Sequence, residues 1–216
     1  KPLRPDFVDS PMVMYTSSKR VKVTDGESLG DVYDNYFNRT WDHFCSHQHA
    51  PNKPRKSGYV FGSCKNNISY LGHNVFTNYR AYGAVAYRQV LTNLIRRLLD
   101  DQPTVTTNMP STARAVLNQQ KDHNRHVLHL LYANTISRGG PVELSGGTVS
   151  ETGISIEVIE ELMPLNDVKV SITLAKKVKR VTLEPQGEQA EFEQDGKTIK
   201  LKIDSLTCHQ MVVLHH

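Results

Sequence analysis

The sequence predicts a mixed α+β protein, in which a partial α/β layer at residues 1–105 is followed by an antiparallel β-sandwich at residues 106–216. Two observations favour this prediction. A long amphipathic helix is expected just before the midpoint of the chain, and beyond residue 106 short alternating strands replace the helical periodicity. A chain of 216 residues is long enough to form two small domains with buried cores.

The first half is expected to contain short strands followed by one helix. Strand-like runs lie at residues 11–15 and 19–23, and runs of the buried-strand type at residues 58–62 and 67–72. The helix is expected over residues 84–100, because its apolar residues recur at helical spacing. A strand, a polar loop and a helix make only the last part of an α/β layer, since a complete one needs several strand–helix units.

The second half alternates apolar and polar residues in six or seven segments, which favours a β-sandwich. One pair of these segments, at residues 190–194 and 197–203, is predicted to form a hairpin with its turn at Asp195-Gly196. Residues 137–153 contain five glycines and are expected to form a mobile loop. The other strands are predicted at residues 113–118, 125–132, 168–174, 178–183 and 209–214.

Charge and composition argue against several classes of protein. The net charge of +4 divides into +5 for residues 1–105 (14 basic against 9 acidic) and −1 for residues 106–216 (12 against 13). The basic residues form no stripe with aromatic platforms, so we expect no nucleic-acid partner. No apolar run approaches the roughly 20 residues of a membrane span, so we expect no membrane partner. Cys45, Cys64 and Cys208 are too few for a disulfide framework or a zinc ribbon.

Residues 36–51 contain the most candidates for functional side chains. They contain the only Trp of the chain, three of its ten His residues, a Cys, an Arg and an Asp. An aromatic face ringed by planar polar groups is typical of carbohydrate sites. Tyr79 and Arg80 read as a second aromatic and basic loop that could complete such a site. The candidate carbohydrate-binding residues, at the edge of a larger site, are Arg39, Trp41, Asp42, His43, His47, His49, Tyr79 and Arg80.

Three other interpretations of this segment stay open. Cys45, His47 and His49 could share one face of a strand and hold a metal ion, although their spacing matches no strong zinc signature. Cys45 could instead be a nucleophile with a neighbouring His as its base. Trp41 and Phe44 could simply anchor the segment to the core. The acidic residues of the second half read as scattered surface charges, so we assign no catalytic residue and expect no cofactor.

Several segments together resemble the C-terminal region of bacterial glycoside hydrolases that are organised like the trimeric β-galactosidases. Residues 36–49 carry the most specific part of the resemblance, which extends from about Met12 to Leu214. Weaker parts lie at residues 129–133, 157–161, 164–165, 185–187 and 209–213. In these enzymes a catalytic (β/α)₈ barrel precedes an amidotransferase-like trimerisation domain and a small β-sandwich.

The resemblance implies a division of roles. Residues 1–105 would be the latter part of the amidotransferase-like domain, and residues 106–216 would be the sandwich. The catalytic carboxylates would belong to a barrel outside this chain, so the chain would not be an enzyme on its own. Its partners would be the rest of the parent glycoside hydrolase, further copies of that parent and a carbohydrate. The compartment, cytoplasmic or periplasmic, is left open. The alternatives are a stand-alone carbohydrate-binding module and a metal- or thiol-dependent enzyme centred on Cys45, His47 and His49.

Overall fold

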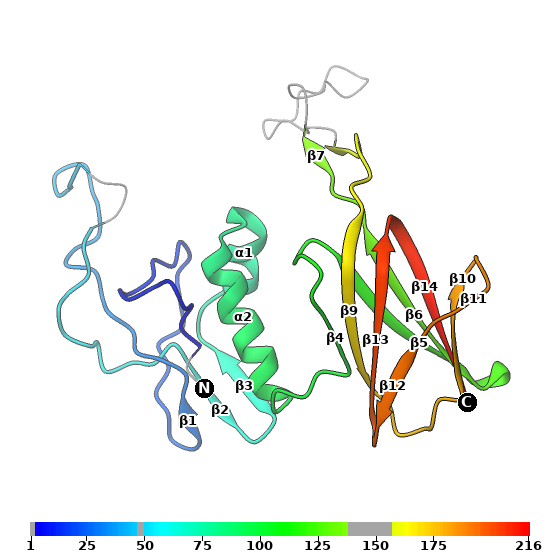
Figure 1. Ribbon diagram of the computed structural model, residues 1–216. Coiled ribbons are helices and arrows are strands. Elements are labelled where there is room, and N and C mark those ends of the chain that lie inside the picture. Colours follow the sequence, from blue (N-terminus) through cyan, green and yellow to red (C-terminus); the bar gives the residue numbers. More distant parts are fainter. Residues whose placement is uncertain (1–2, 47–49, 138–156) are drawn as a thin grey trace. The chain divides into compact units, whose positions relative to one another are not determined.

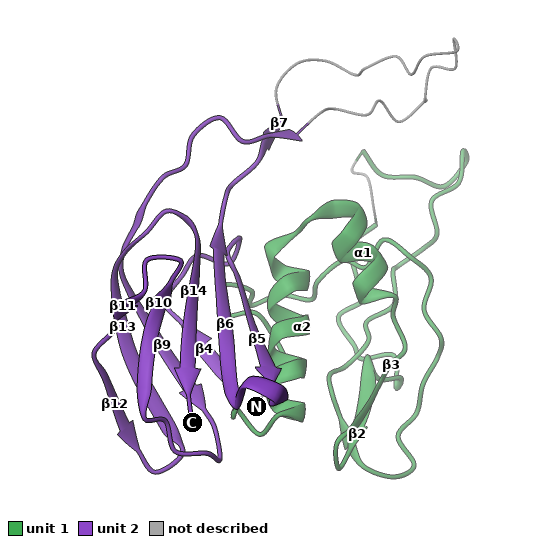
Figure 2. Ribbon diagram, turned by 90° about the vertical axis from the view of Figure 1, so that its right-hand side faces the viewer, with its two compact units in different colours: residues 1–102 green, residues 103–216 purple. Residues whose placement is uncertain are grey.

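The computed structural model describes residues 3–46, 50–137 and 157–216. The chain divides into two compact units, unit 1 (Lys1–Gln102) and unit 2 (Pro103–His216), which Figure 2 shows in different colours. Unit 1 contains both of the α-helices in the described residues, and unit 2 is built from strands. No helix in the described part of the chain combines the length and the apolar character needed to cross a membrane.

Unit 1 consists of a small antiparallel sheet, two helices and long irregular segments (Figure 1). The strand order is β1-β2-β3. The helix predicted from the apolar periodicity is confirmed as α2, which buries Tyr87, Val90, Leu91 and Leu94 along one face. These side chains form the core of the unit together with Leu3, Leu29, Cys64 and Val75. The elements are β1 (Glu27–Ser28), β2 (Gly62–Lys65), β3 (Ile68–Leu71), α1 (Val75–Tyr82) and α2 (Val85–Leu98).

A second helix replaces a predicted loop in unit 1. Tyr79 and Arg80 lie in α1, so the interpretation of residues 79–82 as a loop was wrong. Gly83 ends α1 in the left-handed conformation, with φ of 61°, and its N–H donates to the carbonyl of Tyr79. Glycine reaches this conformation without steric cost, which is why one amphipathic stretch is broken into two helices here.

The strands predicted before residue 24 are not formed. Residues 11–15 form no bridge and, within 19–23, Val21 forms only an isolated bridge with Val60, a residue that precedes β2. Their backbone groups bond elsewhere instead: the Val13 carbonyl accepts a hydrogen bond from the Tyr87 hydroxyl at 2.6 Å. The Lys19 N–H donates to the Gly72 carbonyl at 2.8 Å. Tertiary contacts therefore satisfy backbone groups that the sequence pattern assigned to strands.

Unit 2 is mostly antiparallel β-structure, consistent with the predicted sandwich. A five-stranded sheet has the order β11-β10-β14-β6-β5, and a four-stranded sheet has the order β12-β13-β9-β4. The strands are β4 (Val105–Thr107), β5 (Arg114–Gln120), β6 (Arg125–Tyr132), β9 (Leu165–Thr173), β10 (Arg180–Glu184), β11 (Glu188–Gln189), β12 (Phe192–Asp195), β13 (Thr198–Leu206) and β14 (Cys208–His215). A 3-10 helix, η1 (Lys121–His123), joins β5 to β6, and a small ribbon pairs β7 (Ile136–Ser137) with β8 (Glu157–Val158).

The core of unit 2 lies between its two sheets. Alternate residues of β9 are buried: Val168, Val170 and Ile172 are at most 2% exposed. The predicted hairpin is confirmed one residue later, since Asp195 pairs with Thr198 and Gly196 and Lys197 form the loop. Gly196 has a φ of 56°, as the first position of such a turn requires. The predicted mobile loop falls, apart from Ser137, on residues 138–156 and lies outside the described residues.

Candidate functional site

The base of the segment rich in Trp and His residues is closed by backbone pairing. The Tyr36 N–H donates to the Pro51 carbonyl at 3.1 Å, and the Lys53 N–H donates to the Asp34 carbonyl at 2.8 Å. A bridge between Asn35 and Asn52 lies between these two bonds. The described residues 37–46, which we call the Trp41 loop, project beyond the rest of unit 1 in Figure 1. A loop with a fixed base presents its tip in a restricted region of space.

The tip of the Trp41 loop is a tight turn. Thr40 and His43 exchange backbone hydrogen bonds, at 2.8 Å from the Thr40 N–H and 3.3 Å from the His43 N–H. The Thr40 hydroxyl lies 2.8 Å from Oδ1 of Asp42 and donates to it, which further fixes the turn. The His43 ring stacks on Phe37 with centroids 4.1 Å apart and an angle of 17° between the planes. These contacts leave Trp41 at the outermost position of the turn.

Trp41 is the most exposed large apolar side chain among the described residues. It is 91% exposed, and Phe44 in the same loop is 68% exposed. Neither residue anchors the loop to the core, so that interpretation of the segment is wrong. Indole rings at this level of exposure are unusual, and such rings are enriched where a protein binds a partner or a sugar. The Trp41 loop therefore exposes two aromatic side chains to solvent.

A groove of about 1470 Å³ hollows the same unit beside the base of the loop. Its lining combines aromatic rings with planar polar groups, the combination expected of a carbohydrate site. Tyr36, Phe37 and Asn38 line the groove, which therefore reaches the start of the Trp41 loop. The other aromatic and polar side chains that line it include Tyr15, Tyr33, Arg20, Asn35 and His73.

The carboxylates of this groove are occupied by basic partners. Asp34 pairs with Arg20 at 3.2 Å, Asp31 with Lys56 at 2.8 Å, and Asp9 with Arg4 at 3.2 Å. These ion pairs lie at the surface, because the three carboxylate side chains are at least 34% exposed.

Two residues that line the groove, His73 and Tyr87, have clearly shifted pKa values, and burial is the main cause of both shifts. Burial lowers the pKa of His73, and a hydrogen bond with the backbone of Phe61 opposes this effect in part. The His73 ring also stacks on Phe61 with centroids 5.1 Å apart. Its Nδ1 is buried and has no protein partner in the described residues. A neutral imidazole can donate or accept at that nitrogen, so His73 is suited to hydrogen bonding with a hydroxyl group.

The predicted site residues are only partly brought together. Asn38 lines the groove, whereas Arg39 to His43 follow it in the loop and are not among the lining residues. Tyr79 packs against the core of unit 1 and Arg80 is exposed on α1. His47 and His49 lie outside the described residues. No group of three or more His, Cys, Asp or Glu side chains in the described part of the chain could hold a metal ion.

The groove also contains residues that sequence reasoning did not single out. Tyr15 was expected at the end of a strand over residues 11–15 and Tyr33 in no regular element, so no pattern marked either as a site residue. Tyr15 packs against Tyr82 at the end of α1, with ring centroids 4.6 Å apart. The sequence offers no signal that would place these side chains in one groove.

Comparisons with known proteins point to one class of enzyme. No protein-family model matches the sequence, and no curated protein is similar to it. Among solved structures, the α-L-fucosidase isoenzyme 2 from Paenibacillus thiaminolyticus superposes with a TM-score of 0.84 and 34% sequence identity. The match covers 100% of this chain and 31% of the fucosidase, so the chain spans about a third of that enzyme's length. Its fold is therefore related to part of a glycoside hydrolase.

Proposed function

We propose that this chain is a non-catalytic, accessory part of a glycoside hydrolase. The observation that carries the proposal is the similarity of the whole chain to about a third of an α-L-fucosidase, at 34% identity. The catalytic carboxylates would then belong to another part of the parent enzyme.

The proposed organisation is that of the trimeric β-galactosidases, which the sequence resembles. Unit 1 would be part of an amidotransferase-like trimerisation domain, and unit 2 would be the sandwich that follows it. Exposed apolar side chains support a covered role for unit 1, because surfaces such as those of Ile68, Phe76 and Val85 favour burial against a partner. The partners would be the catalytic barrel and further copies of the parent enzyme.

The proposed task of the Trp41 loop is to form the edge of a carbohydrate site. Trp41 would stack on a sugar ring, while Arg39, Asp42 and His43 would bond to its hydroxyl groups. The exposure of Trp41 and the closed base of its loop support this role. The same exposure favours a second candidate function, in which the chain by itself is a carbohydrate-binding module.

Two measurements test the proposal. The purified chain should not hydrolyse nitrophenyl α-L-fucoside or nitrophenyl β-galactoside, and turnover would show that the chain is itself catalytic. In the parent polypeptide that carries the barrel, Trp41→Ala should raise KM by about tenfold, as expected for the loss of one stacked ring. The matched control is Phe7→Ala, because Phe7 is also exposed, at 62%, but lies outside the Trp41 loop and the groove.

The candidate binding module is separated from the accessory role by calorimetry on the chain alone. Saturable binding of L-fucose, galactose or their oligosaccharides that disappears in Trp41→Ala would favour the module. An unchanged KM in the Trp41→Ala parent enzyme would remove the loop from the carbohydrate site.

A further inference from the structure

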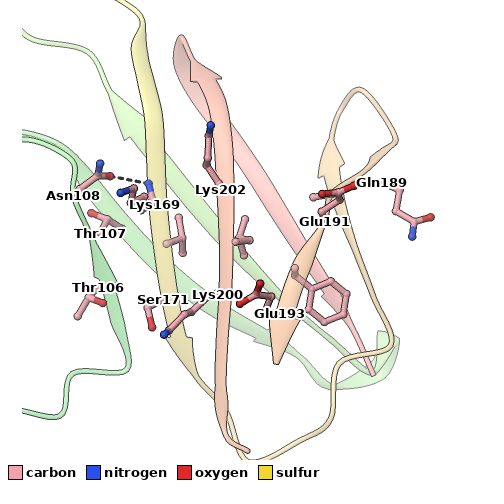
Figure 3. Close-up of a pocket in the computed structure, with 14 residues that line it drawn as sticks. Thr106, Thr107, Asn108, Lys169, Ser171, Gln189, Glu191, Glu193, Lys200 and Lys202 are labelled. Carbon is pink, nitrogen blue, oxygen red and sulfur yellow. Dashed lines mark hydrogen bonds between the residues drawn. The ribbon is translucent and has the colours of Figure 1, made fainter. Parts of the chain in front are cut away.

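A second groove, of about 1150 Å³, crosses the outer face of the four-stranded sheet in unit 2 (Figure 3). Val168, Val170 and Ile172 of β9 point into the core, so the side chains between them point outward. The strand register places Thr106, Ser171, Lys200 and Glu193 in one row across the sheet. Such a row spans about 14 Å, because neighbouring strands lie about 4.8 Å apart.

A second row runs beside the first. Lys169 lies opposite Lys202, and the side chain of Asn108 accepts a hydrogen bond from the Lys169 N–H at 2.8 Å. Glu191, two residues before Glu193, lines the same end of the groove, as Figure 3 shows. The floor of the groove is thus a rigid sheet that presents ammonium groups in its middle and carboxylates at one edge.

Most of these charges are free to bind a ligand. Lys202 is held by Asp167 at 2.7 Å and by Asp204 at 3.1 Å. In contrast, Lys169, Lys200, Glu191 and Glu193 take part in no ion pair within the described residues. Side chains on a packed strand start from restricted positions, so a ligand would meet donors and acceptors that are already arranged.

The mixture of charges selects the class of ligand. An anion would be repelled by Glu191 and Glu193, and a cation by Lys169 and Lys200. Hydroxyl groups suit both signs, because they donate to carboxylates and accept from ammonium groups.

We propose that this groove binds a short, uncharged oligosaccharide, and that it is a carbohydrate site separate from the Trp41 loop. The inference rests on the proposed function in one respect: a part of a glycoside hydrolase would encounter oligosaccharides. The site would hold a glycan chain on the enzyme without taking part in hydrolysis.

Heteronuclear NMR titration of the whole chain tests this inference. The probes are 2′-fucosyllactose and neutral hexasaccharides of glucose, mannose, galactose and xylose. At least one should shift the resonances of β9, β12 and β13 and saturate. Lys200→Gln and Glu193→Gln should each weaken its binding by about fivefold, because each removes one charged hydrogen-bonding group. Lys197→Gln and Glu188→Gln are the matched controls, since both lie in unit 2 but not in the groove.

Two results would overturn the inference: no probe binds at about 10 mM, or binding persists in both groove variants. A concentration-dependent rise in mass that Lys200→Gln abolishes would assign the face to a second copy of the chain, which also overturns it. Failure of this site is distinguishable from failure of the proposed function, because Trp41→Ala should leave binding in the groove unchanged.

Discussion

The two units bury apolar side chains to very different degrees. Unit 2 has a core of 14 buried residues between two sheets, and the side chains of Leu128, Leu130 and Ile172 are fully inaccessible. Unit 1, of similar length, has a core of 8 buried residues. Of the 20 large apolar side chains that are exposed in the described residues, 13 belong to unit 1. Unit 2 therefore has the larger core, and the apolar surface of unit 1 is what we expect if, as proposed above, a partner covers it.

The largest effect should come from the core of the sandwich. Leu128→Ala removes a fully buried side chain from β6, so we expect the unfolding free energy of unit 2 to fall by about 2–5 kcal/mol. Calorimetry on the whole chain should show the transition of unit 2 moving to lower temperature. Circular dichroism at 222 nm follows the α-helices, both of which lie in unit 1 among the described residues, and it should stay unchanged.

Leu131→Ala is the control for this prediction. Leu131 is on the same strand but 36% exposed, so its loss should cost far less. If Leu128→Ala lowered both transitions together, the units would unfold as one body, and the expectation of a separate transition for unit 2 would be wrong.

A smaller effect is expected from the contact that fastens the N-terminal segment of unit 1. Tyr87→Phe removes the hydroxyl that donates to the Val13 carbonyl at 2.6 Å, without changing the packing of the ring. We expect a loss of about 0.5–1.5 kcal/mol, the usual net value of one hydrogen bond. Denaturant unfolding followed at 222 nm measures it. Tyr70→Phe is the control, because Tyr70 is 52% exposed, and an equal loss there would assign the effect to something other than the bond to Val13.

The pH dependence of unit 1 should depend on His73. An unfolded histidine titrates near pH 6.5, and burial lowers the pKa of His73 in the folded protein. Between these two pKa values the unfolded state binds more protons, so the unfolding free energy decreases as pH falls below about 6.5. It levels off once the pH is below the folded pKa.

His73→Gln should flatten this dependence in the unfolding transition followed at 222 nm. The sandwich serves as an internal reference, because burial also lowers the pKa of His126 and of His215 in unit 2. Its transition should keep its own acid sensitivity in the His73→Gln variant. An unaltered pH profile for unit 1 would mean that His73 is not the group responsible.

The sequence predicted unit 2 better than unit 1, for a physical reason. Strands of a sandwich alternate between core and solvent, so segments such as β6 and β13 carry a regular pattern. The segments before residue 24 in unit 1 are held by single contacts such as Tyr87 to Val13, which leave no periodic trace. The division of the helical region into α1 and α2 depends on Gly83, whose left-handed conformation periodicity does not reveal.

The two candidate sites also differ in how far the sequence could predict them. The Trp, His and Arg residues at 36–51 were enough to predict a candidate carbohydrate site there without knowledge of the fold. The structure adds that Trp41 is 91% exposed. The groove in unit 2 could not be predicted in this way. Thr106, Ser171, Lys200 and Glu193 read as ordinary solvent-facing positions, and only the strand register places them in one row.

The smallest effect on stability is expected at the edge strands, where self-association in solution tests the difference in exposed apolar surface between the two units. β3 and β5 are both edge strands, but β3 exposes Ile68 and Tyr70, at 72% and 52%, while Val116 on β5 is 50% exposed among polar neighbours. Ile68→Thr should change the unfolding free energy by less than about 0.5 kcal/mol. It should nevertheless reduce self-association of the isolated chain, because an apolar edge strand promotes pairing between molecules. Sedimentation velocity at several concentrations measures this self-association.

Val116→Thr is the matched change in unit 2, and it should leave self-association unchanged. If the two variants behaved alike, the exposed apolar surface of unit 1 would not differ from that of unit 2 in its tendency to bind another molecule.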